Sequence, residues 1–155
     1  MMKKSTILIL ILLIITAATA CIYLRGRDEP SEGNISILYE GQSSTIDPFS
    51  RGLQPVSGTL INGKGEEKEV SESGVPLQDV ISLSEIKDVD YRSAKIISSD
   101  EYAADLTVEE INEKDRVYLI KDISDDKSVS IRLIVFGDPN SKRQVKNVER
   151  IELYK

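Results

Sequence analysis

An uncharged run near the amino terminus constrains this chain more than any other feature. Residues 5–24 contain no charged side chain. At about 1.5 Å per residue, a helix of this length spans about 30 Å, which is roughly the thickness of the hydrocarbon core of a bilayer. The run therefore predicts a membrane anchor over residues 1–24. The rest of the chain is long enough for one ordinary domain and little more.

The charges on either side of the run indicate its orientation. Lys3 and Lys4 precede it, and Arg25 and Arg27 follow it together with two acidic residues. The positive-inside rule then favours a single pass with a cytoplasmic amino end and a domain outside the cytoplasm. Residues 25–34 are polar and contain glycine and proline, so we expect a short tether there. The domain is expected to occupy residues 35–155.

Two other interpretations of the amino-terminal segment remain open. Small residues at 18–20 precede Cys21, the only cysteine of the chain, and this pattern also fits a lipoprotein signal with lipid on Cys21. A simple cleaved secretory signal is the other alternative. Apolar residues 22–24 continue the run beyond Cys21, which favours an uncleaved helix. All three interpretations place the domain outside the cytoplasm.

The composition excludes several classes of function. The chain has no histidine, and its single cysteine lies in the amino-terminal run. A Ser-His-Asp triad and a zinc site with histidine or thiolate ligands are therefore excluded for the domain. From Asn34 onward there are 16 Lys and Arg against 23 Asp and Glu, a net charge of −7. This acidic balance argues against nucleic acid as a general partner.

Hydrophobic patterning predicts a domain made mostly of short strands. An Asn62-Gly63 pair marks a hairpin, Pro76 suits the first turn of a helix over 74–81, and Thr107 and Glu110 have the spacing of a capping box for a helix over 107–112. Residues 42–55 are polar and are expected to be irregular. The fold class predicted is α+β, a mixed β-sheet domain with a few short helices. The strands are expected at 35–39, 56–61, 68–72, 91–98, 102–106, 116–121, 128–136 and 148–154.

Three cations near the carboxyl terminus are the candidate binding residues. Lys142, Arg143 and Lys146 follow a turn directly after the strand expected at 128–136. Three cations within five residues could hold an anionic group. The alternative is a basic edge that offsets nearby acidic residues, and the spacing alone favours that alternative.

Four segments of the chain, taken in order, are Gly74–Ile81, Asp100–Tyr102 with Leu106-Thr107, Ile131–Gly137 and Val145–Leu153. Together they resemble the oxidoreductase molybdopterin-binding domain, the fold of the sulfite oxidase family. The resemblance covers about residues 56–154. It implies a mixed α+β fold that, in active members, holds a molybdenum–pterin cofactor through a cysteine thiolate, with basic and polar side chains on the pterin and its phosphate.

The chain departs from the family pattern at the positions that matter for catalysis. No cysteine lies outside residues 1–24, Glu101 stands where the family has glycine, and Phe136 stands where it has proline. The upstream region that carries the cysteine is reduced to residues 42–55. The resemblance therefore implies the fold more than the activity. It leaves Lys142, Arg143 and Lys146 as the nearest candidates for holding a phosphate.

These observations lead to three hypotheses of function. The first is an extracytoplasmic binding domain, catalytically degenerate and without a cofactor, whose ligand or protein partner the sequence does not name. The second is a redox subunit that binds molybdopterin without a protein thiolate. The third is a structural module of a cell-surface assembly. The Lys3-Lys4 pair is not a twin-arginine signal, so we expect the chain to cross the membrane unfolded, without a buried cofactor.

Overall fold

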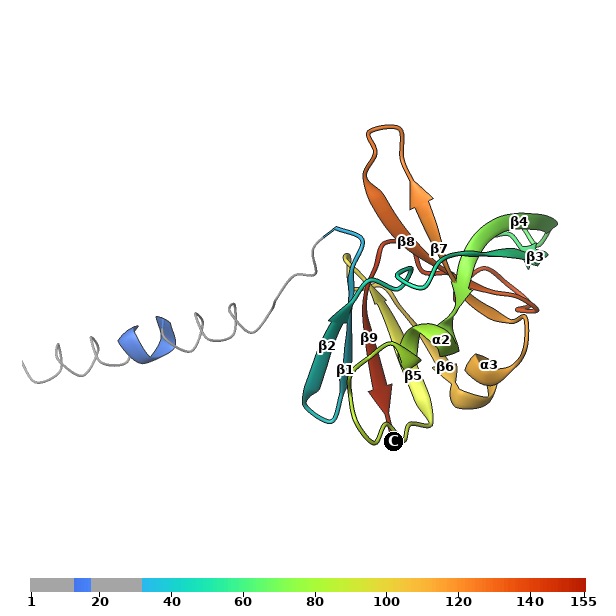
Figure 1. Cartoon of the computed structure of the whole chain (residues 1–155). Coiled ribbons are helices and arrows are strands. Elements are labelled where there is room, and N and C mark those ends of the chain that lie inside the picture. Colours follow the sequence, from blue (N-terminus) through green and yellow to red (C-terminus); the bar gives the residue numbers. More distant parts are fainter. Residues whose placement is uncertain (1–12, 18–31) are drawn as a thin grey trace, which may run out of the picture.

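The computed structural model describes residues 13–17 and 32–155 of the chain. Within this part, the domain is mostly β-sheet with a few short helices, so the predicted α+β class with a mixed sheet is confirmed (Figure 1). Its strands form two sheets, one of five strands and one of four.

The five-stranded sheet is mixed, with the order β2-β1-β9-β5-β6. β1 and β9 run parallel to one another, and the other neighbouring strands are antiparallel. The first and last strands of the domain therefore lie side by side in the middle of this sheet. Its strands are β1 (Ile35–Tyr39), β2 (Gln42–Ile46), β5 (Ser93–Ser98), β6 (Ala103–Thr107) and β9 (Val148–Tyr154).

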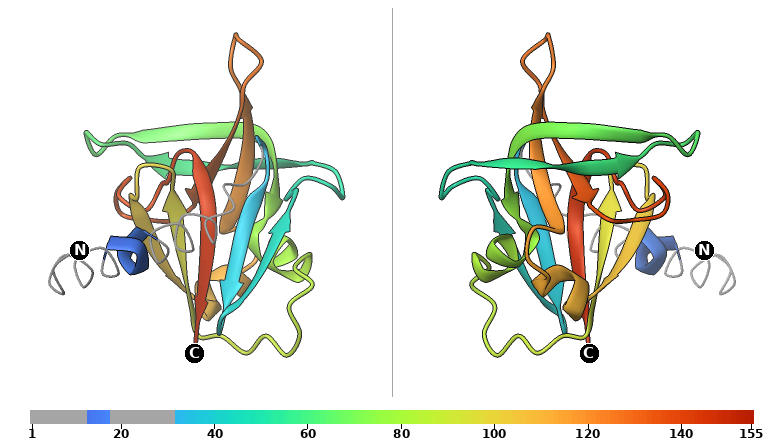
Figure 2. Two further views of the ribbon diagram at one scale, coloured as in Figure 1. Left: turned by 90° about the vertical axis from the view of Figure 1, so that its left-hand side faces the viewer. Right: turned by 90° about the vertical axis from the view of Figure 1, so that its right-hand side faces the viewer.

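The four-stranded sheet is antiparallel, with the order β3-β4-β7-β8. β4 pairs with β7 only at Gly74, Val75 and Pro76. Beyond these residues the β3–β4 hairpin leaves the sheet and crosses the β7–β8 hairpin (Figure 2). The strands are β3 (Gln54–Ile61), β4 (Glu67–Pro76), β7 (Val117–Ile123) and β8 (Val129–Val135).

Two hydrophobic clusters use opposite faces of the β7–β8 hairpin. Alternate residues such as Leu119 and Leu133 are fully buried in the main core, which the five-stranded sheet shares. The intervening residues, including Ile120 and Ile134, belong to a second cluster that contains side chains from the β3–β4 hairpin. A strand buried on both faces carries a continuous run of apolar residues, and β7 does so at 117–120 and β8 at 133–135. The second cluster consists of Val56, Leu60, Val70, Tyr118, Ile120, Ile134 and Phe136.

The two predicted helices are present, with one boundary different from the prediction. The helix α3 (Val108–Asn112) begins with the predicted capping box: the Thr107 Oγ1 accepts from the Glu110 backbone N–H at 3.3 Å, and the Glu110 Oε2 accepts from the Thr107 N–H at 3.0 Å. The helix α2 (Leu77–Ser82) follows Pro76. The prediction that it starts at Gly74 is wrong, because Gly74 lies in β4 and pairs with β7.

The prediction that residues 42–55 are irregular is also wrong in part. Residues Gln42–Ile46 form β2, which pairs with β1 along its whole length. β2 lies at the edge of the sheet, so its polar side chains can remain in water while its backbone completes a ladder. An exposed edge strand carries little hydrophobic signal, so the side chains of Gln42–Ile46 do not by themselves predict a strand.

The predicted anchor lies largely outside the residues that the structure describes. Residues 13–17 are helical, and residues 1–12 and 18–31, which include Cys21 and most of the tether, are not described. Among residues 13–17 and 32–155, no helix is long and apolar enough to span a bilayer. The anchor over 1–24 therefore stays a prediction.

Candidate functional site

The three cations that the sequence singles out lie on the segment between β8 and β9. This segment, residues 136–147, returns alongside β8, where the Leu133 N–H donates to the Val145 carbonyl oxygen at 2.8 Å. The Val145 side chain is fully buried in the main core. These contacts fix the path of the segment, so the positions of Lys142, Arg143 and Lys146 follow from the packing of their neighbours.

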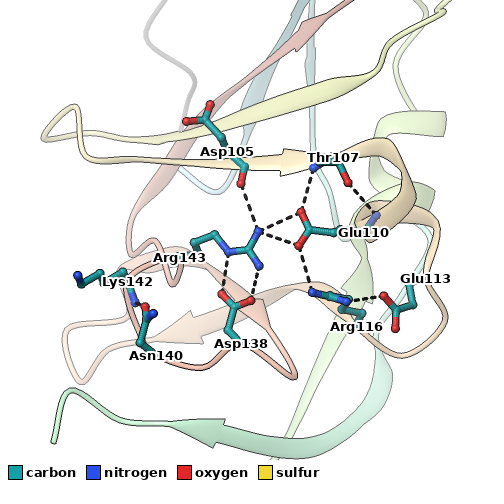
Figure 3. A network of polar contacts seen from close by, with 9 residues as sticks. All are labelled: Asp105, Thr107, Glu110, Glu113, Arg116, Asp138, Asn140, Lys142 and Arg143. Atoms are coloured by element: carbon teal, nitrogen blue, oxygen red, sulfur yellow. Dashed lines mark hydrogen bonds and ion pairs between the residues drawn. The ribbon is translucent and has the colours of Figure 1, made fainter. Parts of the chain in front are cut away.

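Arg143 is bound by carboxylates of its own domain (Figure 3). Its Nε donates to the Asp138 Oδ2 at 2.8 Å, and its Nη2 contacts the other Asp138 oxygen. Its Nη1 lies 2.8 Å from the Glu110 Oε1. The hydrogen bonds that Arg143 donates to Asp138, together with its contacts to Glu110, raise the Arg143 pKa further above its ordinary value despite the effect of burial. The charge of Arg143 is therefore balanced inside the protein.

Glu110 connects this pair to a second arginine (Figure 3). Its Oε1 also accepts from the Arg116 Nη2 at 3.1 Å, and Arg116 reaches Glu113 at 2.5 Å. Burial acts to raise the Glu110 pKa, but the Thr107 N–H and the two guanidinium groups outweigh it and hold the pKa below its ordinary value. The network ties the 136–147 segment to α3 and to the residue preceding β7.

Lys142 and Lys146 are both exposed, and they lie apart from the Arg143 network. The Lys142 backbone is held, since its N–H donates to the Asn140 Oδ1 at 2.9 Å and its carbonyl oxygen accepts from the Tyr102 hydroxyl. Its side chain points away from Arg143 (Figure 3). Lys146 instead lines a groove on the molecule with residues from other strands. The structure therefore does not gather the three cations into one site.

The groove that includes Lys146, here called the lysine groove, has a volume of about 480 Å³. The β3–β4 hairpin contributes Leu60, Lys68 and Val70, and the β7–β8 hairpin contributes Arg132. A volume of this size is within the range of small-molecule sites, which combine apolar walls with a few polar groups. Residues far apart in the sequence thus form one candidate binding site.

The cations that line the lysine groove differ in whether their charge is free to bind a ligand. Arg132 is held by two acids, with its Nη2 2.6 Å from the Glu72 Oε2 and its Nε 2.9 Å from the Asp122 Oδ2. Lys68 and Lys146 are exposed, and within the described part of the chain neither forms an ion pair. The two lysines therefore supply the positive charge that a ligand can use. The arrangement suits a small anion that also carries an apolar part.

Sequence reasoning named only one of the three cations in this groove. Arg132 lies within Ile131–Gly137, one of the segments that carry the family resemblance, and a charged residue inside an apolar strand is a signal that could have identified it. Lys68 lies among charged residues on an exposed hairpin and has no such signal. Its role depends on the way that the β3–β4 hairpin crosses the sheet.

The molybdenum group that the resemblance implies does not fit the residues of the domain. The only cysteine of the chain is Cys21, so residues 35–155 offer no thiolate ligand. Within the described ranges, no cluster of three or more acidic, histidine or cysteine side chains could hold a metal ion. Of the residues expected to hold a phosphate, Lys146 lines the groove and Arg143 is paired with carboxylates of the domain. The expectation that they hold a phosphate stays a prediction.

No family model matches the chain, and no curated protein is similar to it in sequence. The candidate function therefore rests on the geometry of the site.

Proposed function

We propose that the chain is a membrane-anchored, extracytoplasmic binding module with a domain of the molybdopterin-binding type that has lost catalysis. Its ligand is a small anion held in the lysine groove. The observation that carries the proposal is that Arg132 and Lys146, which belong to two separate segments of the family resemblance, line the same groove. The predicted topology, a single pass with a cytoplasmic amino end, places this groove outside the cytoplasm.

The residue inventory supports a binding role over catalysis. The domain contains no histidine and no cysteine, so it lacks the commonest general base and the thiolate that active members of the family use. Two of its arginines, Arg132 and Arg143, are paired with carboxylates of the same chain. What remains available to a ligand is the pair of exposed lysines, which line the groove together with the apolar Leu60 and Val70 side chains.

The ligand class follows from this combination. Two ammonium groups favour a phosphate or carboxylate, and apolar residues in the lining favour a ring or short chain attached to it. A phosphorylated pterin is one molecule of this class, which agrees with the family resemblance. Metal is not required, since the lysines bind the anion directly.

The test uses the full chain purified from membranes in detergent. Elemental analysis should find no stoichiometric molybdenum, and isothermal titration with pyrophosphate as the probe should detect binding. The double variant Lys68→Glu with Lys146→Glu should lose that binding, whereas Lys142→Glu, a matched charge reversal on the same segment as Lys146, should retain it. Stoichiometric molybdenum would overturn the loss of catalysis. Equal pyrophosphate affinity in the wild type and the double variant would overturn the lysine groove.

A further inference from the structure

The lysine groove is lined by acids as well as by cations. Glu72 and Asp122 both line it, and both side chains are partly exposed. Their common partner is Arg132, so two carboxylates share the single charge of one guanidinium. Within the described part of the chain, neither Lys68 nor Lys146 lies within ion-pair distance of either acid. The part of the groove around Arg132 therefore carries a negative charge that the domain leaves unbalanced.

The two acids differ in how fully Arg132 satisfies their oxygens. Both Asp122 oxygens accept from Arg132, the Oδ2 from Nε at 2.9 Å and the Oδ1 from Nη2 at 3.3 Å. Glu72 accepts through its Oε2 alone, from Nη2 at 2.6 Å. Among residues 13–17 and 32–155, none donates to the Glu72 Oε1. Glu72 therefore keeps one carboxylate oxygen for a hydrogen-bond donor on a ligand.

The order of residues on β4 separates this acid from a free lysine by apolar side chains. Alternate residues of a strand lie on the same face, so Lys68, Val70 and Glu72 share one face of β4, and all three line the groove. Leu60, the β3 residue opposite Lys68, also lines it. Over about 14 Å of strand, the lining thus presents an ammonium group, an apolar stretch and a carboxylate with an open oxygen.

We infer that the ligand of the lysine groove is an amino acid whose carboxylate and amine stand at opposite ends of a short apolar chain. The inference rests on the proposed function and specifies the ligand of that same groove. The lysines hold the carboxylate, as proposed above. Leu60 and Val70 contact the chain, and the Glu72 Oε1 accepts from the terminal ammonium group.

Charge and hydrogen bonding together select an ammonium group at Glu72. A second anion at this position would be repelled by Glu72 and Asp122. An apolar group would remove water from the Glu72 Oε1 without replacing the hydrogen bond. An ammonium group carries N–H donors and a positive charge, so it satisfies the open oxygen and also balances the negative charge that Arg132 leaves uncompensated.

The test compares four compounds of similar size by isothermal titration into the full chain in detergent. The first is ε-aminocaproate, which has a carboxylate and an amine at opposite ends. It should bind about tenfold more tightly than caproate, which lacks the amine, and than hexylamine, which lacks the carboxylate. It should also bind more tightly than norleucine, an isomer of ε-aminocaproate with both charged groups at one end.

A charge removal on β4 identifies the group that recognises the amine. Glu72→Gln keeps the size of the side chain and an oxygen for Arg132, and it should abolish the preference for ε-aminocaproate over caproate. The matched control is Glu69→Gln, which removes a charge from an exposed position on the other face of β4 and should keep the preference. Circular dichroism should show that both variants are folded.

Pyrophosphate, the probe of the proposed function, separates the failure of this inference from the failure of that function. The inference alone is overturned if pyrophosphate binds but the wild type does not prefer ε-aminocaproate to caproate, to hexylamine and to norleucine. It is also overturned if folded Glu72→Gln keeps the preference of the wild type. If neither pyrophosphate nor any of the four compounds binds, the proposed function fails and the inference fails with it.

Discussion

Arg143 and Asp138, five positions apart in the chain, form a two-point ion pair, and the Asp138 side chain is 4% exposed. A carboxylate buried to this degree depends on its partner, because an unpaired charge away from water is costly. The pair therefore fixes Arg143 inside the domain, and it explains why a residue that the sequence offers as an anion binder has its charge already balanced. The same pair helps to fix the 136–147 segment, which carries Lys146 at the lysine groove.

Removing the charge of Asp138 should destabilise the domain. Asp138→Ala leaves the Arg143 guanidinium with Glu110 as its remaining carboxylate partner, and we expect a loss of about 3 kcal/mol in the free energy of unfolding. Urea unfolding of the full chain followed by circular dichroism measures the loss. Lys142→Ala, on the exposed side of the same segment, should change the free energy by less than about 0.5 kcal/mol. Equal effects of the two variants would contradict the structural role of the pair.

The network around Glu110 should make the domain sensitive to acid. The pKa of Glu110 is lower in the folded state than its ordinary value of 4.5, because the Thr107 N–H and the arginines outweigh the effect of burial. Its contribution to stability is therefore fully present well above pH 4.5 and is lost as the pH falls through the folded pKa. Glu110→Gln should reduce the fall in thermal midpoint between pH 6 and pH 3. Glu109→Gln, an exposed neighbour on α3, should leave it unchanged.

The capping box of α3 should contribute measurably to stability. Thr107→Ala removes the oxygen that accepts from the Glu110 N–H, and we expect a cost of about 1 kcal/mol. Thr107→Ser keeps that oxygen and should recover most of the loss. Urea midpoints of the two variants give the comparison, and a Thr107→Ser variant no more stable than Thr107→Ala would show that the cap is not the cause.

Two glycines should differ in whether a second substitution rescues them. A Cβ at Gly58 would lie 2.6 Å from the Phe136 Cδ1, and one at Gly74 would lie 2.5 Å from the Leu119 backbone oxygen. Both alanine variants should lose about 1–3 kcal/mol from overpacking. Phe136→Leu should recover part of the loss in Gly58→Ala, relative to the cost of Phe136→Leu alone, since it removes the ring that the Cβ meets. It should not help Gly74→Ala, because the obstacle there is backbone.

Gly63 provides the control for this comparison. A Cβ at Gly63 would have only the Ser141 Oγ nearby, at 3.8 Å, so Gly63→Ala should be tolerated within about 0.5 kcal/mol. The thermal midpoints of the three alanine variants, measured under one condition, give the comparison. If Gly63→Ala were as destabilising as the other two, the cost would come from the loss of glycine itself and not from the close contacts.

The sequence by itself determined the features that depend on neighbouring residues. The capping box from Thr107 to Glu110 and the Asn62-Gly63 hairpin are local, because each is satisfied by groups within a few residues. Most strands could be predicted in the same way, since alternation and apolar runs reflect the burial of each face. β2 could not, because its formation depends on β1 offering a backbone ladder and not on its own polar side chains.

The tertiary structure alone decided which cations are available to a ligand. Arg143 meets Glu110, which lies 33 residues earlier in the chain, while Lys68 and Lys146 come to one groove from segments far apart in the sequence. Spacing in the sequence grouped Lys142, Arg143 and Lys146, but the availability of a charge depends on which carboxylates pack against it. That pairing follows from how the hairpins cross and pack, and it is not encoded in the order of neighbouring residues.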